Sequence, residues 1–251
     1  MAVCADPTVM LPAEDFECGE THTIECTSEN GTTFDEIQVP LDASICAGAT
    51  LEVNDPGPYD VGEHTIVVTD AADNDAEICT ATLIVEDTST PTVAEHEVSL
   101  WPPNHKFHTI DVDDCVTVTD DCDGDVEVEF LWASSDEVVN GLGDGNHEPD
   151  IRNLTCGSVE LRAERSGNEN GRVYHLGWRA WDDDDNTIEG VCTVRVQHDR
   201  SGRVAVDDGE AYRIDAPAEC GDGGSGSGGG GSGGGGSGSG GGGGGSVGGG
   251  L

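Results

Sequence analysis

The stretch Val61–Asp87, VGEHTIVVTDAADNDAEICTATLIVED, decides the fold, because Trp181–Asp199, WDDDDNTIEGVCTVRVQHD, repeats its pattern later in the chain. In both stretches an alternating run ends at an Asp, Asp70 or Asp182, and an Asn follows four positions later. A Cys then opens a second alternating run. Internal repetition of this kind indicates that one structural unit has been used twice.

The two halves of the repeated unit predict a β-hairpin with an acidic turn. In Cys79–Val85 and Cys192–Val196, β-branched residues dominate and apolar side chains recur with a period close to two. Such runs form strands of antiparallel sheets with one buried and one solvated face. The connecting segments, Asp70–Asp75 and Asp182–Asn186, are rich in residues that bond their own backbone and tolerate positive φ.

Short alternating runs recur along the rest of the chain, and no long helical periodicity is present. The predicted strands are Thr21–Cys26, Glu36–Pro40, Thr50–Val53, His64–Thr69, Ile78–Val85, Val93–Leu100, His108–Val112, Val116–Thr119, Val126–Trp132, Val159–Ala163, Val173–Trp181 and Val191–Gln197. This density of short strands is typical of β-sandwiches. We predict domains at 1–87 and 92–200, a further hairpin or extension at 201–220, and a disordered Gly/Ser-rich tail at 221–251.

The charge of the chain restricts its partners. The 51 acidic residues outnumber 10 basic ones, giving a formal net charge of −41, which excludes nucleic acids and anionic membranes as direct partners. No run of 18 apolar residues is present, so we predict no membrane insertion. Two compatible explanations for the acidity stay open: a calcium-loaded extracellular module, or adaptation to high salt.

The ten cysteines predict a disulfide framework in an oxidising compartment, because no CxxC pair is present. Five of them lie before residue 88, and this odd number requires at least one to be free or to pair elsewhere. The first residues show no signal peptide. We therefore expect the chain to be a portion of a longer exported protein, located outside the cell or on its surface.

The first predicted domain resembles a known extracellular module. Gly62–Thr65 (GEHT), Thr69–Asn74 (TDAADN) and Cys79–Val85 (CTATLIV) are similar to the pattern of the hyalin repeat (HYR), an immunoglobulin-like domain. Asp73 departs from that pattern, since the family usually has Gly there. The resemblance covers about residues 1–87 and implies a disulfide between Cys4 and Cys79.

The second predicted domain resembles a bacterial relative of these repeats, found in secreted and surface proteins. The matching segments are Leu100–Lys106 (LWPPNHK), Asn140–Gly145 (NGLGDG), Leu161–Gly167 (LRAERSG) and Gly171–Tyr174 (GRVY). Together the two resemblances imply an all-β chain of two tandem immunoglobulin-like antiparallel β-sandwich domains, followed by the disordered tail. They imply no reaction, because fold does not determine function.

Calcium is the leading hypothesis for a bound group, because closely spaced Asp and Asn residues in turns supply the oxygen ligands that it prefers. The candidate metal ligands are Asp120, Asp121, Asp123 and Asp125; Asp144, Asn146 and Asp150; and Asp182, Asp184, Asp185 and Asn186. A fourth cluster, Asp70, Asp73, Asn74 and Asp75, is a weaker candidate. The competing interpretation is that these are solvated acidic turns.

Other reactive side chains are interpreted as structural. Glu164, Tyr174 and His175 suggest acid–base chemistry, but the polar residues of Arg172–Trp181 are predicted to form the outward face of a strand, and no catalytic signature is present. The histidines His96, His105, His108, His147 and His175 show no i, i+2 or i, i+4 pair and are predicted to lie on the surface. We expect Trp132 and Trp178 in the core, and Arg162, Arg165 and Arg172 in internal ion pairs.

These observations predict a non-catalytic extracellular structural or adhesion module that is stabilised by calcium and belongs to a larger secreted or surface protein. Extracellular matrix, glycans, cell-surface proteins and neighbouring domains of the same polypeptide are the expected partners. The alternative is an accessory, carbohydrate-binding domain of a secreted hydrolase.

Overall fold

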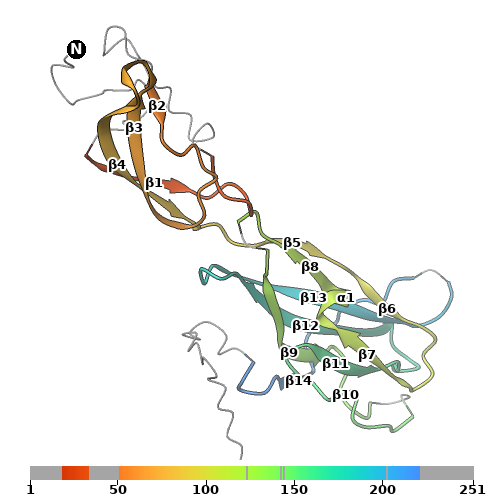
Figure 1. Cartoon of the computed structure of the whole chain (residues 1–251). Coiled ribbons are helices and arrows are strands. Elements are labelled where there is room, and N and C mark those ends of the chain that lie inside the picture. The colour runs from red at the N-terminus through yellow and green to blue at the C-terminus, as the bar shows by residue number, and fades with distance from the viewer. Residues whose placement is uncertain are drawn as a thin grey trace, which may run out of the picture.

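The computed structural model describes residues 19–33, 51–122, 124–141, 143, 145–201 and 203–220. They form two tandem β-sandwich units arranged end to end (Figure 1). The predicted strand Glu36–Pro40 and the predicted tail at 221–251 lie outside these residues. In the part of the chain that is described, no helix has the length and apolar composition needed to cross a membrane.

The first unit is described through a four-stranded sheet of order β1-β4-β3-β2. Its elements are β1 (Thr21–Glu25), β2 (Leu51–Val53), β3 (Gly62–Asp70), the 3-10 helix η2 (Ala71–Asp73) and β4 (Ala76–Glu86). Alternate residues of β3 and β4, including Ile66, Val68, Leu83 and Val85, are buried in one apolar cluster with Tyr59. The period-two pattern of the repeated unit thus places its apolar residues on one face, as predicted.

The second unit is a sandwich around a larger core. Its elements are β5 (Thr92–Glu95), β6 (Val98–Leu100), β7 (Phe107–Asp111), α1 (Val112–Cys115), β8 (Val116–Thr119), β9 (Glu127–Ser135), β10 (Ile151–Arg152), β11 (Ser158–Arg162), β12 (Gly171–Trp181), β13 (Thr187–Gln197) and β14 (Tyr212–Asp215). One sheet has the order β14-β9-β12-β13-β6, and the others are β10-β11-β7 and β5-β8. A single buried cluster joins residues from these sheets.

The sheets are not purely antiparallel, which corrects the predicted fold class in one respect. In the first unit β1 pairs with β4 in parallel, and in the second β6 pairs with β13 in parallel. Parallel neighbours need long crossover connections, and both pairs are separated by most of their unit. The predicted strand Val93–Leu100 also divides into β5 and β6, which join different sheets.

The segment after β13 is an extension that returns to the sheet. β14 pairs with the edge of β9, whereas residues 203–206 form no strand, so the hairpin alternative for 201–220 is wrong. Val204 and Val206 are more than half exposed, which fits their lack of a sheet partner. A disulfide between Cys156 and Cys220 fixes the end of the extension.

The start of β12 carries charged residues into the core, contrary to the predicted outward face. Arg172 and Tyr174 are fully buried, because the Arg172 guanidinium pairs with Asp150 at 2.5 Å and with Glu137 at 3.1 Å. Burial raises the pKa of the Tyr174 phenol, and its O–H donates to the Arg162 carbonyl at 2.8 Å. Internal ion pairing is thus confirmed for Arg172.

Internal ion pairs were also predicted for Arg162 and Arg165, and these two arginines have different partners. Arg162 lies 3.6 Å from Asp150 and 3.8 Å from Glu164, so its prediction is confirmed. Arg165 instead donates to the carbonyl of His198.

Two tryptophans cover glycines on neighbouring strands. Trp178 is 1% exposed, and a Cβ added to its cross-strand partner Gly190 would come within 2.2 Å of the indole. Trp132 is half-buried and lies over Gly177 in the same way. Only glycine leaves room for either ring. The core position predicted for Trp178 is confirmed by its burial, whereas Trp132 is only half-buried and does not belong to the core cluster, so the prediction was wrong for Trp132.

A Gly190→Ala variant is expected to lower the free energy of unfolding by about 1–3 kcal/mol, because the added methyl displaces the packed Trp178 ring. Gly157→Ala is the matched control, since no atom lies within 4 Å of its added Cβ. Urea denaturation followed by tryptophan fluorescence compares the two variants. Equal stability of both would contradict the packing described here.

Candidate metal centre at the junction of the two units

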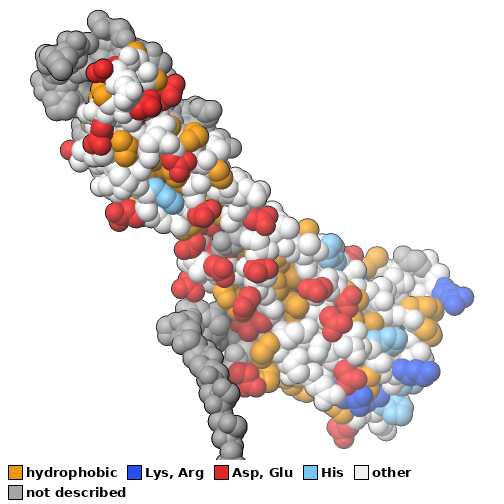
Figure 2. Space-filling model, in the orientation of Figure 1, with side chains coloured by type: hydrophobic (Ala, Val, Ile, Leu, Met, Phe, Trp, Pro, Cys, Tyr) orange, Lys and Arg blue, Asp and Glu red, His pale blue; other side chains and the backbone are white. Residues whose placement is uncertain are grey.

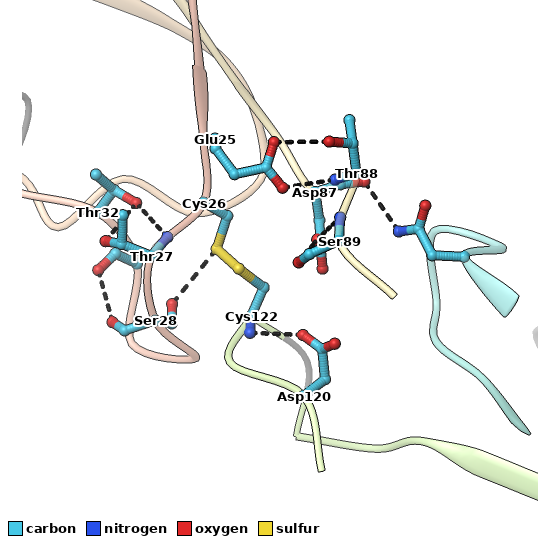
Figure 3. The surroundings of a disulfide bond; sticks show 12 residues. Glu25, Cys26, Thr27, Ser28, Thr32, Asp87, Thr88, Ser89, Asp120 and Cys122 are labelled. Carbon is cyan, nitrogen blue, oxygen red and sulfur yellow. Dashed lines mark hydrogen bonds between the residues drawn. A yellow bond between two sulfur atoms is a disulfide. The ribbon is translucent and has the colours of Figure 1, made fainter. Parts of the chain in front are cut away.

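A disulfide joins the two units. Cys26, directly after β1, bonds to Cys122 in the loop between β8 and β9, 96 positions later (Figure 3). The excess cysteine of the first segment therefore pairs elsewhere, one of the two outcomes that the odd count allowed. Cys115–Cys192 and Cys156–Cys220 stay within the second unit. The three disulfides between described residues are typical of proteins from oxidising compartments.

The predicted Cys4–Cys79 bridge is not tested. Cys79 is disulfide-bonded, and its partner lies outside the described residues, as does Cys4.

The linker between the units is held by polar contacts from both sides. The Glu25 carboxylate accepts hydrogen bonds from the backbone N–H and the hydroxyl of Thr88, both at 2.8 Å. The Asp87 carbonyl accepts a bond from the Asn186 side chain at 3.0 Å. Asn186 belongs to the β12–β13 turn, so the acidic turn of the second copy of the repeat contacts the end of the first unit.

Two carboxylates meet beside the disulfide. Oxygen atoms of Asp87 and Asp120 and the Cys122 sulfur all lie within 4.8 Å of one another, and Figure 3 shows both Asp side chains next to the bond. The Cys122 N–H donates to Asp120 Oδ1 at 2.8 Å, so the residue that forms the disulfide also orients one carboxylate. The sulfur, being oxidised, is not a thiolate ligand.

The Asp87 carboxylate is unusual because it is buried and only one of its two oxygens has a hydrogen-bond partner among the described residues. Asp87 is 6% exposed, and its Oδ1 accepts bonds from the N–H and hydroxyl of Ser89. Its Oδ2 has no hydrogen-bond partner among the residues that the structure describes. A buried carboxylate oxygen without a partner is costly, so this atom is a candidate ligand for a cation.

Basic side chains are unevenly distributed along the chain. Every Lys and Arg of the chain lies at or after Lys106, so the first unit contains none. On the face drawn in Figure 2, acidic side chains cover both units, while the basic ones gather at the far end of the second unit. The first unit therefore brings no basic side chain of its own to the junction.

Asp182 organises the neighbouring turn. Its Oδ1 accepts bonds from the N–H groups of Asp184 and Asn186, at 3.0 and 2.8 Å. Its Oδ2 is buried and has no hydrogen-bond partner in the described part of the chain. Asp70 has the same place in the first unit, where its side chain caps η2 by accepting from the Ala72 N–H. The repeated Asp therefore shapes the hairpin turn in both copies.

The predicted calcium ligands lie in different parts of the structure and differ in burial. Asp120 and Asn186 lie at the junction, whereas Asp150 is fully buried between Arg172 and Arg162, which accounts for it without a metal. The exposed members are Asp121, Asp125, Asn146, Asp184 and Asp185, together with Asp73, Asn74 and Asp75 of the weaker cluster. Asp123 and Asp144 lie outside the described residues.

Asp87 is the junction residue that the sequence interpretation missed as a ligand. In the sequence it is the last residue of the first predicted domain, 1–87. The available signal was its place directly after the last strand of a unit, where a linker and two loops of the next unit meet.

No protein-family model matches the chain, and no curated protein matches it. The hyalin-repeat resemblance therefore stays a prediction. Among solved structures, the chain is similar to three domains, EC1-3, of protocadherin gamma C5, with 16% identity over 71% of this chain and a TM-score of 0.31. It spans 65% of that structure's length.

Two further solved structures show a distant likeness. Fibronectin(III)-like modules of Clostridium thermocellum CbhA match at 13% identity, with a TM-score of 0.22, over 75% of this chain and 93% of theirs. Three N-terminal domains of the bacteriophage RB49 outer capsid protein Hoc match at 10% identity, with a TM-score of 0.21, over 72% and 67%. Likenesses this distant do not carry a function to this chain.

Proposed function

We propose that this chain is a non-catalytic extracellular structural or adhesion module whose two β-sandwich units are held in one relative orientation by the Cys26–Cys122 disulfide and by calcium. The observation that supports the proposal is the junction, where the disulfide stands beside the carboxylates of Asp87 and Asp120. A spacer or adhesive module has to hold its two ends at a fixed distance and orientation. A junction restrained by a covalent bond and an ion suits that task.

Calcium fits the donor set better than a transition metal. Calcium takes about six to eight oxygen ligands, including carboxylates, backbone carbonyls and water. Asp87 Oδ2 and the Asp120 carboxylate offer oxygen only, and the nearby sulfur is oxidised. Asp87 and Asp120 would hold the ion, with the remaining ligands supplied by carbonyl groups and water. The ion would also reduce repulsion within a strongly acidic chain.

Calcium added to chelator-treated protein is expected to bind with measurable heat and to raise the melting temperature. If calcium reaches one hundred times its Kd, the stabilisation is about 2.7 kcal/mol. An Asp87→Asn variant should lose most of this gain, because the amide keeps the shape and the Ser89 contacts but lacks the charge. Asp121→Asn, which changes an exposed neighbour, is the control.

Absence of both heat and melting shift at millimolar calcium would refute the calcium part of the proposal. An Asp87→Asn variant that responds like the native chain would instead place the ion elsewhere.

The partner of such a module is proposed to be extracellular matrix, a glycan or a cell-surface protein. A binding screen against matrix proteins and glycans, run with and without calcium, tests this part separately. Binding in neither condition would leave a spacer that joins neighbouring domains of one polypeptide.

A further inference from the structure

Two histidines that are far apart in the sequence meet at the end of the second unit. The rings of His105, in the loop before β7, and His147, in the loop before β10, lie with centroids 4.8 Å apart and planes inclined by 48°. The sequence interpretation placed both on the surface because they form no short-range pair. The fold creates the pair by bringing two loops together.

His105 is held firmly by the segment that follows β11. Its N–H donates to the Ala163 carbonyl at 2.9 Å, and its own carbonyl accepts from Arg162 Nη1 at 2.9 Å. Its ring Nδ1 lies 2.8 Å from Glu164 Oε2. Glu164 is fully buried, whereas the His105 side chain is 45% exposed. The loop position and the ring orientation are therefore both fixed.

The carboxylate contact determines which ring nitrogen is available. When the Glu164 carboxylate is ionised, it can only accept hydrogen bonds, and Nδ1 of His105 is then the atom that donates to Glu164 Oε2. In the neutral ring this leaves the lone pair on Nε2. Histidines that bind metals commonly show this arrangement, in which a carboxylate fixes the tautomer and makes the ligating nitrogen more basic.

Gly145 keeps the space beside the two rings free of a side chain. A Cβ placed on Gly145 would lie 3.4 Å from Cε1 of His105 and 3.5 Å from Nε2 of His147. The positive φ of +91° at Gly145 also favours glycine at this position. Atoms of both imidazoles, including His147 Nε2, thus border the same small space.

We propose that His105 and His147 form a two-histidine site for a divalent transition-metal ion such as Zn²⁺, with Glu164 as the positioning residue of His105. Imidazole nitrogen suits Zn²⁺, Cu²⁺ and Ni²⁺, whereas the oxygen-only junction suits calcium. Water completes the coordination in the isolated chain. The site is independent of the proposed calcium centre.

Titration of Zn²⁺ into the full chain in calcium-containing buffer tests the site, because calcium then occupies the carboxylate sites. We expect one binding event of one Zn²⁺ per chain that weakens at least about tenfold in His105→Gln and in His147→Gln. A Glu164→Gln variant should weaken it by about 10–100-fold, as second-sphere changes do. His175→Gln, which alters a partly buried histidine on β12, should leave it unchanged.

Side-chain ¹⁵N NMR supplies a readout that does not depend on global stability, because only the His105 and His147 ring signals should shift with Zn²⁺. His147 is exposed, so its variant keeps the test valid even if Glu164→Gln fails to fold. Zn²⁺ binding that is as strong in either histidine variant as in the native chain, or no binding event at all, would overturn the proposal.

Discussion

An Arg172→Met variant is expected to lose about 3–5 kcal/mol of unfolding free energy, the usual cost of removing one partner from a buried ion pair. Arg172 is fully buried and is the closest cation to Asp150 at 2.5 Å and to Glu137 at 3.1 Å. Methionine approximates the length of the side chain but leaves both carboxylates without this charge. The cost therefore arises mainly from stranded negative charge, with a smaller contribution from packing.

Two variants distinguish charge from packing. Arg152→Met removes a partly exposed pair with Glu160 and should cost no more than about 1 kcal/mol. Arg172→Met/Asp150→Leu should be more stable than Arg172→Met alone, because apolar replacement of both partners is often tolerated. Urea denaturation with the disulfides intact measures all three. If Arg172→Met lowers the free energy of unfolding no more than Arg152→Met does, the buried pair of Arg172 and Asp150 contributes little to stability.

The strands were largely predictable because their signal is local. In β3, β4, β12 and β13 the β-branched residues and the period of two identify a strand whatever its neighbours are. The choice of neighbour is not local, so the parallel pairs β1–β4 and β6–β13 were missed. The same limit explains Arg172: alternation marks which residues share a face, but not that Asp150 and Glu137 make a charged residue tolerable inside.

The junction was predictable only in pieces. The acidic turns that contain Asp120 and Asn186 were recognised from composition, and the odd number of cysteines required either a free cysteine or a pairing outside the first segment. For Asp87 the sequence offers only its place directly after the last strand of the first unit, since its burial depends on two loops that reach it from the second unit. His105 and His147 were separated for the same reason, because only the fold brings their loops together.

A Cys26→Ser/Cys122→Ser variant is expected to release the two units from their fixed orientation and to weaken calcium binding. The native bond closes a loop with a sequence separation of 96, for which the chain-entropy model predicts a contribution of roughly 4.7 kcal/mol and experience with native disulfides about 2–5 kcal/mol. Cys122 also orients Asp120 through its backbone N–H. Loss of the bond should therefore separate Asp120 from Asp87 for part of the time.

Small-angle scattering with and without millimolar calcium, together with calorimetric calcium titration, measures both effects. The Cys26→Ser/Cys122→Ser variant should give the scattering of a mixture of relative orientations of the two units. Calcium should reduce the range of these orientations by bridging the carboxylates. Cys115→Ser/Cys192→Ser is the control, because it removes a bond within the second unit and should destabilise that unit without changing how the two units are joined. Unchanged scattering and unchanged calcium affinity in the Cys26→Ser/Cys122→Ser variant would mean that the linker contacts of Glu25 and Asn186 are sufficient to fix the junction.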